Sequence, residues 1–84
     1  GVIESRLNDF IMKENIPIKK FNISKLPNKF WDNRIEISVE FREMTNFKNI
    51  ENSLNLLKNF AKSWPKHEKP EKWIIENKNS NTKK

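Results

Sequence analysis

Apolar and polar side chains alternate most regularly between Arg34 and Arg42. Every second residue of this segment is apolar, and these residues are Ile35, Ile37, Val39 and Phe41. A period of two is typical of a β-strand that buries one face and exposes the other, as in an antiparallel sheet. The polar positions carry two arginines and two glutamates, for which we expect cross-strand ion pairs.

Two other segments show the three- and four-residue spacing of amphipathic helices. The first runs from Val2 to Glu14 and the second from Phe47 to Trp64. Their apolar positions are Ile3, Leu7, Phe10 and Ile11 in the first segment, and Phe47, Ile50, Leu54, Leu57, Phe60 or Ala61 and Trp64 in the second. Thr45 or Asn46 can cap the start of the second helix, and Pro65 ends it by disfavouring helical geometry at the preceding residue.

The segment from Ile16 to Ile23 predicts a strand, although its apolar residues change parity near Lys19 and Lys20. This change indicates a β-bulge or a switch of the buried face. Pro17 has no N–H to donate, so we expect this strand at a sheet edge, or the proline among its first residues. The following segment, Ser24 to Asn33, is predicted as a loop.

The C-terminal residues leave two alternatives open. Pro70 fits the first position of a short helix, whereas the sequence Trp-Ile-Ile within residues 72–76 favours β structure. We prefer the helix and keep a third strand as the alternative. Residues 78–84 contain three lysines and no apolar side chain, which predicts a disordered basic tail.

Together these elements predict one small α+β domain over residues 1–77. Its order is α-β-β-α with a short C-terminal helix (or a third strand), and two antiparallel strands pack against two helices on the apolar side of the Arg34–Arg42 strand. A two-stranded sheet is marginal, so we expect support from residues 72–76, a partner chain or the rest of a longer protein. The first residue, glycine rather than methionine, also favours a processed chain or a piece of a larger one.

Composition excludes several classes of function. The 84 residues include no cysteine, which rules out a disulfide framework or thiolate metal site and favours an intracellular, cytoplasmic compartment. The only glycine is at position 1, so the glycine-rich phosphate loops of nucleotide-binding proteins are missing. No apolar run approaches the roughly 18–20 residues of a membrane span, and we therefore expect no membrane partner.

The formal net charge of +6 is unevenly distributed. Residues 1–40 carry seven basic and six acidic side chains, a net of +1, whereas residues 41–84 carry ten and five, a net of +5. This positive field favours anionic partners. We therefore predict a small, basic, non-enzymatic module that binds RNA or DNA through its C-terminal half. The candidate phosphate-binding residues are Lys58, Lys62, Lys66, Lys69 and Lys72, with Trp64 and Trp73 as candidate stacking groups.

The alternative is a protein–protein interaction or regulatory domain of a larger protein or assembly. Its segment from Pro65 to Glu76 would dock on another chain, because tryptophan is enriched at interface hot spots. The basic charge would select an acidic partner. No catalytic residue is predicted: His67 is the only histidine, and no motif ties a serine or carboxylate to it. No metal site and no cofactor are predicted either.

From Leu7 to Pro17 the chain resembles the first helix and strand entry of double-stranded RNA-binding domains, through its Leu-Asn-Asp-Phe and Asn-Ile-Pro sequences. Three features of that family are missing. No Gly-Pro-x-His loop precedes Arg34, no third strand fits between Phe41 and Phe47, and the second helix lacks the Lys-Lys-x-Ala-Lys start that grips phosphate. The chain is therefore not assigned to this family.

Overall fold

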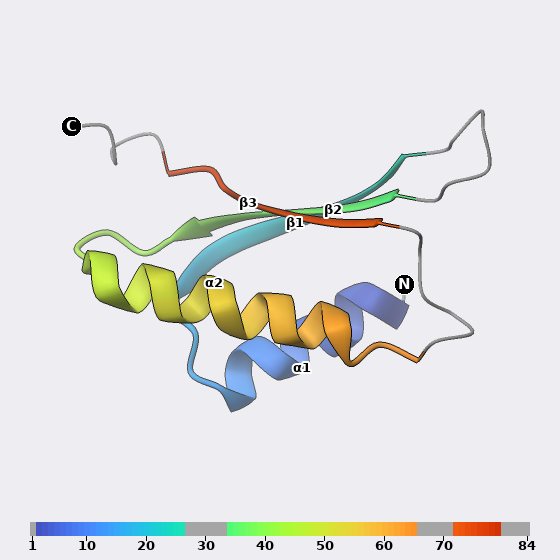
Figure 1. Ribbon diagram of the computed structural model, residues 1–84. Coiled ribbons are helices and arrows are strands. Elements are labelled where there is room, and N and C mark those ends of the chain that lie inside the picture. The colour runs from blue at the N-terminus through green and yellow to red at the C-terminus, as the bar shows by residue number, and fades with distance from the viewer. Residues whose placement is uncertain (1, 27–33, 66–71, 80–84) are drawn as a thin grey trace.

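The computed structural model of the chain describes residues 2–26, 34–65 and 72–79. These residues form two helices and three strands, in the order α1 (Val2–Lys13), β1 (Ile18–Leu26), β2 (Arg34–Phe41), α2 (Phe47–Lys62) and β3 (Lys72–Asn77). Both helices lie on one side of the sheet, and no described helix or strand covers the other side, which we call the open face (Figure 1). The predicted small α+β domain with two helices is confirmed.

The sheet is mixed, with β2 in the centre and β1 and β3 at its edges. β1 pairs with β2 antiparallel, as predicted, whereas β3 pairs with β2 parallel. The parallel pairing requires the long connection that α2 provides. The preferred short C-terminal helix is therefore wrong, and the alternative of a third strand is confirmed. As a strand, the segment pairs its backbone with β2 and also adds Trp73 and Ile75 to the apolar cluster.

The core lies between the sheet and the helix layer. The alternation predicted for β2 is confirmed, because its residues are half-buried and buried in turn. Its four apolar side chains pack with residues from both helices and from the start of β1. The buried cluster consists of Leu7, Ile11, Ile16, Ile18, Ile35, Ile37, Val39, Phe41, Ile50, Leu57, Phe60 and Trp64. Both helices thus cover the face that the sequence predicts.

The irregular start of β1 also agrees with the sequence. Asn15 adopts a left-handed backbone conformation (φ 54°) after α1, and the strand begins at Ile18, directly after Pro17. The β1–β2 register shifts between Ile18 and Lys20, which confirms the predicted bulge. β1 continues to Leu26, so the predicted loop begins too early. The rest of that loop, residues 27–33, lies outside the described residues.

α2 begins as predicted and ends earlier. The side chain of Asn46 accepts a hydrogen bond from the backbone N–H of Asn49 at 2.8 Å, which makes Asn46 the N-cap. The helix ends at Lys62 rather than Trp64, with Ser63 as its C-cap. No helix within the described parts of the chain is long and apolar enough to cross a membrane.

Beyond β3, two more residues pair with β2. The backbone N–H of Lys78 donates to the carbonyl of Val39 at 2.8 Å. The side-chain amide of Asn79 accepts from the N–H of Phe41 at 2.7 Å and donates to the Phe41 carbonyl at 3.3 Å. This amide therefore imitates the backbone of a further strand residue. Residues 80–84 of the predicted tail lie outside the described residues, and the disorder of the tail stays a prediction.

Candidate nucleic-acid interface

An aromatic cluster joins α1, α2 and β3 at one end of the domain. The rings of Trp64 and Trp73 have their centroids 6.0 Å apart, and Phe60 lies 5.8 Å from Trp64 and 6.4 Å, edge-on, from Trp73. Phe10 of α1 packs on Phe60 at 5.2 Å. Each such aromatic pair adds about 0.5–1.5 kcal/mol to the effect of burial. The cluster therefore fixes the end of α2 against the start of β3.

Cationic side chains lie at the same end of the domain as this cluster. The guanidinium carbon of Arg6 lies 5.1 Å from the centre of the Trp64 ring, within the range of a cation–π contact. Lys62 is exposed in the last turn of α2, two residues before Trp64. Lys72 is exposed at the start of β3 and pairs in register with Arg34. We call Arg6, Arg34, Lys62 and Lys72 the basic end.

The basic end has two sides, separated by the sheet. Trp73 faces the helices, and successive strand residues point to opposite faces, so Lys72 and its neighbour Arg34 belong to the open face. Lys58 and Lys62 are exposed on α2, one helical turn apart, in the other layer. Of the predicted lysines, the three that the structure describes, Lys58, Lys62 and Lys72, thus do not form a strip on one face. Lys66 and Lys69 lie outside the described residues.

Away from the basic end, carboxylates accompany the cations of the open face. Glu40 lies 3.8 Å from the ammonium of Lys19 and 3.6 Å from that of Lys20, which confirms the expected cross-strand ion pairing for Glu40. The ammonium of Lys78 lies 3.2 Å from Glu76. These exposed pairs contribute little to stability, but they reduce the positive potential of this part of the sheet.

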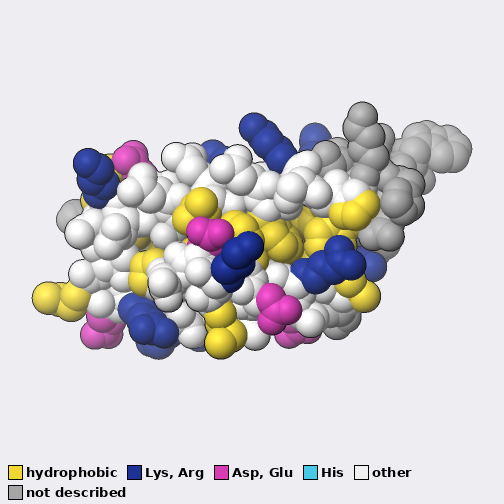
Figure 2. Space-filling view, turned by 90° about the horizontal axis from the view of Figure 1, so that it is seen from below, with side chains coloured by type: hydrophobic (Ala, Val, Ile, Leu, Met, Phe, Trp, Pro, Cys, Tyr) yellow, Lys and Arg dark blue, Asp and Glu magenta, His cyan; other side chains and the backbone are white. Residues whose placement is uncertain are grey.

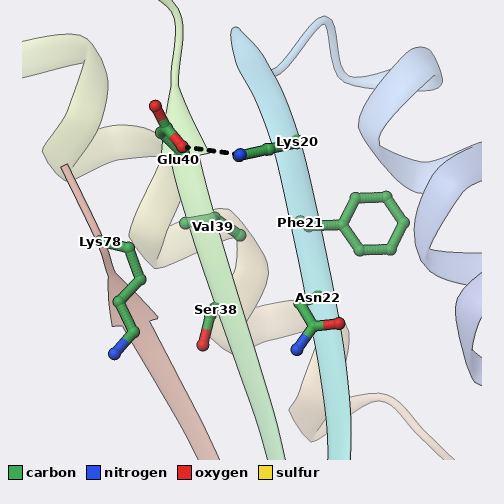
Figure 3. A pocket seen from close by; sticks show the side chains of 7 residues that line it. All are labelled: Lys20, Phe21, Asn22, Ser38, Val39, Glu40 and Lys78. Carbon is green, nitrogen blue, oxygen red and sulfur yellow. Dashed lines mark ion pairs between the residues drawn. The ribbon is translucent and has the colours of Figure 1, made fainter.

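A shallow hollow of about 330 Å³ lies between β1 and β2 at the same place. Figure 3 shows Lys20 directed towards Glu40 across the two strands, with Lys78 on the far side of β2. The residues that line the hollow are Lys20, Phe21, Asn22, Ser38, Val39, Glu40 and Lys78. Both cations of the hollow have a carboxylate nearby, Glu40 for Lys20 and Glu76 for Lys78, which reduces its attraction for a phosphate.

The helix layer presents a different surface. Figure 2 shows hydrophobic side chains gathered along the middle of this face, with Lys and Arg side chains beside them. Trp64 is only 7% exposed, and the half-buried Trp73 has an indole N–H with no hydrogen-bond partner among the described residues. Base stacking on either ring therefore requires the aromatic cluster to open.

Arg6 and Arg34 are absent from the residues that the sequence singles out. Both belong to the N-terminal half, whose net charge is close to zero, and no local pattern connects them to Trp64 or Lys72. Only the packing of α1 on α2, and of β2 beside β3, brings them to the basic end. Among the described residues, no group of three His, Cys, Asp or Glu side chains is placed to hold a metal ion.

Comparisons of the chain with protein-family models, with curated proteins and with solved structures found no match.

Proposed function

We propose that this protein is a non-enzymatic module that binds nucleic acid by contacting phosphates at its basic end. One observation carries the proposal: four cations from four different elements, Arg6, Arg34, Lys62 and Lys72, lie at the end of the domain that holds the aromatic cluster. Positive side chains that neutralise phosphates release condensed counterions, and this release drives binding without base recognition. Lys58, one turn before Lys62, extends the surface along α2.

The open face favours phosphate contacts over recognition of bases. Single-stranded RNA-binding sheets stack bases on exposed aromatic side chains. Among the residues that the structure describes on this face, none is aromatic, because Phe21 and Trp73 both lie opposite buried positions of β2 on the helix side. We therefore expect binding that depends strongly on salt and weakly on sequence. Lys66 and Lys69 stay part of the proposal through their place in the chain between Pro65 and Lys72.

A salt titration with a matched pair of charge reversals tests this function. Fluorescence anisotropy would measure the binding of labelled single- and double-stranded RNA and DNA at several salt concentrations. The test variant, Lys58→Glu/Lys62→Glu, changes the exposed side of α2. The control variant, Lys13→Glu/Lys48→Glu, changes the net charge equally on exposed residues near the opposite helix ends. Circular dichroism melting would show that both variants fold.

The proposal predicts that the test variant binds more weakly. The slope of log K against log salt concentration should become shallower by about 0.7–0.9 units for each phosphate contact removed. The control variant should keep most of the slope of the parent chain. Equal losses in both variants would show that net charge alone, rather than the basic end, governs binding. No binding of any of the four probes at low salt would reject the function.

The second candidate, a protein-interaction domain, is favoured by two exposed apolar side chains at the other end of α2. Met44 is 96% exposed and Phe47 is 73% exposed, whereas apolar side chains of this size are usually buried. Trp73→Ala does not test this candidate, because Trp73 belongs to the aromatic cluster. Phe47→Ser does, since it should leave the melting temperature unchanged and abolish binding of a protein partner.

A further inference from the structure

The two edge strands of the sheet differ in how they are protected from pairing with another strand. Natural sheets protect their edges with proline, bulges and charged side chains, lysine above all. β1 has all three devices: Pro17 directly before it, a register shift after Ile18, and lysines at positions 19, 20 and 25. Lys25 lies opposite Ile35, on the helix side of the sheet, where an extra strand would have to accommodate its charge.

Within β3 (Lys72–Asn77) there is no proline and no register shift, and the charged side chains, Lys72 and Glu76, lie only near its two ends. Its register with β2 is continuous, and its central residues are Trp73, Ile74 and Ile75. The N–H of Lys78 donates to β2. Since N–H and C=O groups alternate in direction along a strand, those of Trp73 and Ile75 face away from β2. Among the described residues no further strand pairs with this edge, so it offers outward backbone groups beside apolar side chains.

A second copy of β3 matches this edge in one register. Directly opposite residues of an antiparallel pair have their side chains on the same face of the sheet. The two-fold axis between two copies of β3 must therefore pass between one residue and the same residue of the other copy. With the axis at Ile74, Trp73 lies opposite Ile75 and Lys72 lies opposite Glu76. With the axis at Ile75, Ile74 lies opposite Glu76, and with the axis at Trp73, Lys72 lies opposite Ile74. Only the first register joins apolar to apolar and cation to carboxylate.

We propose that β3 pairs antiparallel with the β3 of a second copy of this chain, with Ile74 on the two-fold axis. The outward N–H and C=O groups of Trp73 meet those of Ile75 in the other copy, and Lys72 of each copy meets Glu76 of the other. The two three-stranded sheets then form one continuous sheet. A two-fold contact of this kind is closed, so it leaves no further β3 edge for aggregation.

The solution mass of the full chain tests the proposal in the absence of nucleic acid. Sedimentation equilibrium over a wide range of protein concentrations should show the mass rising from 10.1 kDa towards twice that value. Glu76→Lys places like charges opposite each other at both ends of the contact, and should raise the dissociation constant of the dimer about tenfold or more. The exchanged variant Lys72→Glu/Glu76→Lys restores opposite charges and should restore the dimer.

A matched control lies on the other edge. Lys25→Glu reverses one of the charges of β1 and should leave the β3-mediated dimer unchanged. Lys72 and Glu76 are exposed, so the charge variants should keep the fold, which melting curves would verify. The proposal is overturned if the chain stays monomeric at millimolar concentration, if Glu76→Lys dimerises as well as the parent, or if the exchanged variant fails to recover. None of these outcomes bears on phosphate binding by Lys58 and Lys62.

Discussion

β1 and β3 flank the same central strand, but different interactions hold them there. β1 precedes β2 in the chain and pairs with it antiparallel along eight register positions. β3 arrives after α2, pairs parallel over six positions, and is fastened by the aromatic cluster at its start and by Asn79 beyond its end. Non-local pairing brings a larger entropy cost. We infer that the pairing of β3 with β2 depends on side-chain contacts, whereas the pairing of β1 with β2 depends chiefly on backbone hydrogen bonds.

The largest expected effect comes from disrupting β2, the central strand with which both edge strands pair. Ile37 of β2 is fully buried and lies opposite Ile23 on one side and Ile75 on the other. Ile37→Asp introduces an unpaired charge into the core, which should cost about 4 kcal/mol or more and unfold the domain. Thermal melting followed by circular dichroism should show no cooperative transition. Ser38→Asp, on the open face, is the matched control and should melt cooperatively.

A pair of aromatic truncations sharpens the difference between the edges. Trp73 and Phe21 are both half-buried on the helix side, at opposite edges. Trp73→Ala removes the contacts with Phe60 and Trp64 and should cost about 2–4 kcal/mol. Phe21→Ala, with no ring partner among the described residues, should cost about 1–2 kcal/mol. Denaturant titration would measure both, and equal losses would show that the aromatic cluster is no special anchor of β3.

The second anchor of β3 is smaller. Asn79→Ala removes both hydrogen bonds to the backbone of Phe41 and should cost about 1–2 kcal/mol, since two part-buried backbone groups lose a partner. Lys78→Ala, its neighbour, removes only an exposed ion pair and should change stability by less than about 0.5 kcal/mol. If both variants melt at the temperature of the parent chain, the C-terminal tail begins at Lys78 and does not anchor β3.

The smallest expected change in stability concerns a turn residue with positive φ, Met44, which precedes α2. Asn15, before β1, and Met44, before α2 and β3, both have positive φ, 54° and 71°. The N–H of Thr45 donates to the carbonyl of Arg42 at 3.2 Å, which places Met44 at the turn position that favours glycine or asparagine. Met44→Asn should therefore stabilise the domain by about 0.5–1 kcal/mol, or roughly 2–8 °C. An unchanged or lower melting temperature would contradict this account of the turn.

The same contrast explains how far the sequence predicts the fold. β2 exposes one face and buries the other, so its alternation is complete and its limits are predicted to within a residue. β3 packs three consecutive apolar residues into a six-residue edge strand, which is too short to show a period, and Pro70 fits a helix start equally well. The parallel pairing of β3 with β2 has no local signature at all.

The candidate site is predicted only in its local part. Lys58 and Lys62 share a helix, so their spacing places them on one side of it. The contact of Arg6 with Trp64 and the pairing of Arg34 with Lys72 join residues that are far apart in the chain. No spacing rule links such residues, because the packing of separate elements brings them together. The sequence also gives no sign that the side chain of Asn79 pairs with β2.

Hydrogen exchange at the two edges tests most directly whether β3 is the edge that pairs with a second copy. The amides of Trp73 and Ile75 face outward on β3, and by the same alternation those of Phe21 and Ile23 face outward on β1. NMR would follow exchange of these four amides at low and at high protein concentration. We predict that Trp73 and Ile75 become protected as the concentration rises, while Phe21 and Ile23 keep exchanging rapidly. Exchange independent of concentration at Trp73 and Ile75, or protection that rises instead at Phe21 and Ile23, would contradict the account.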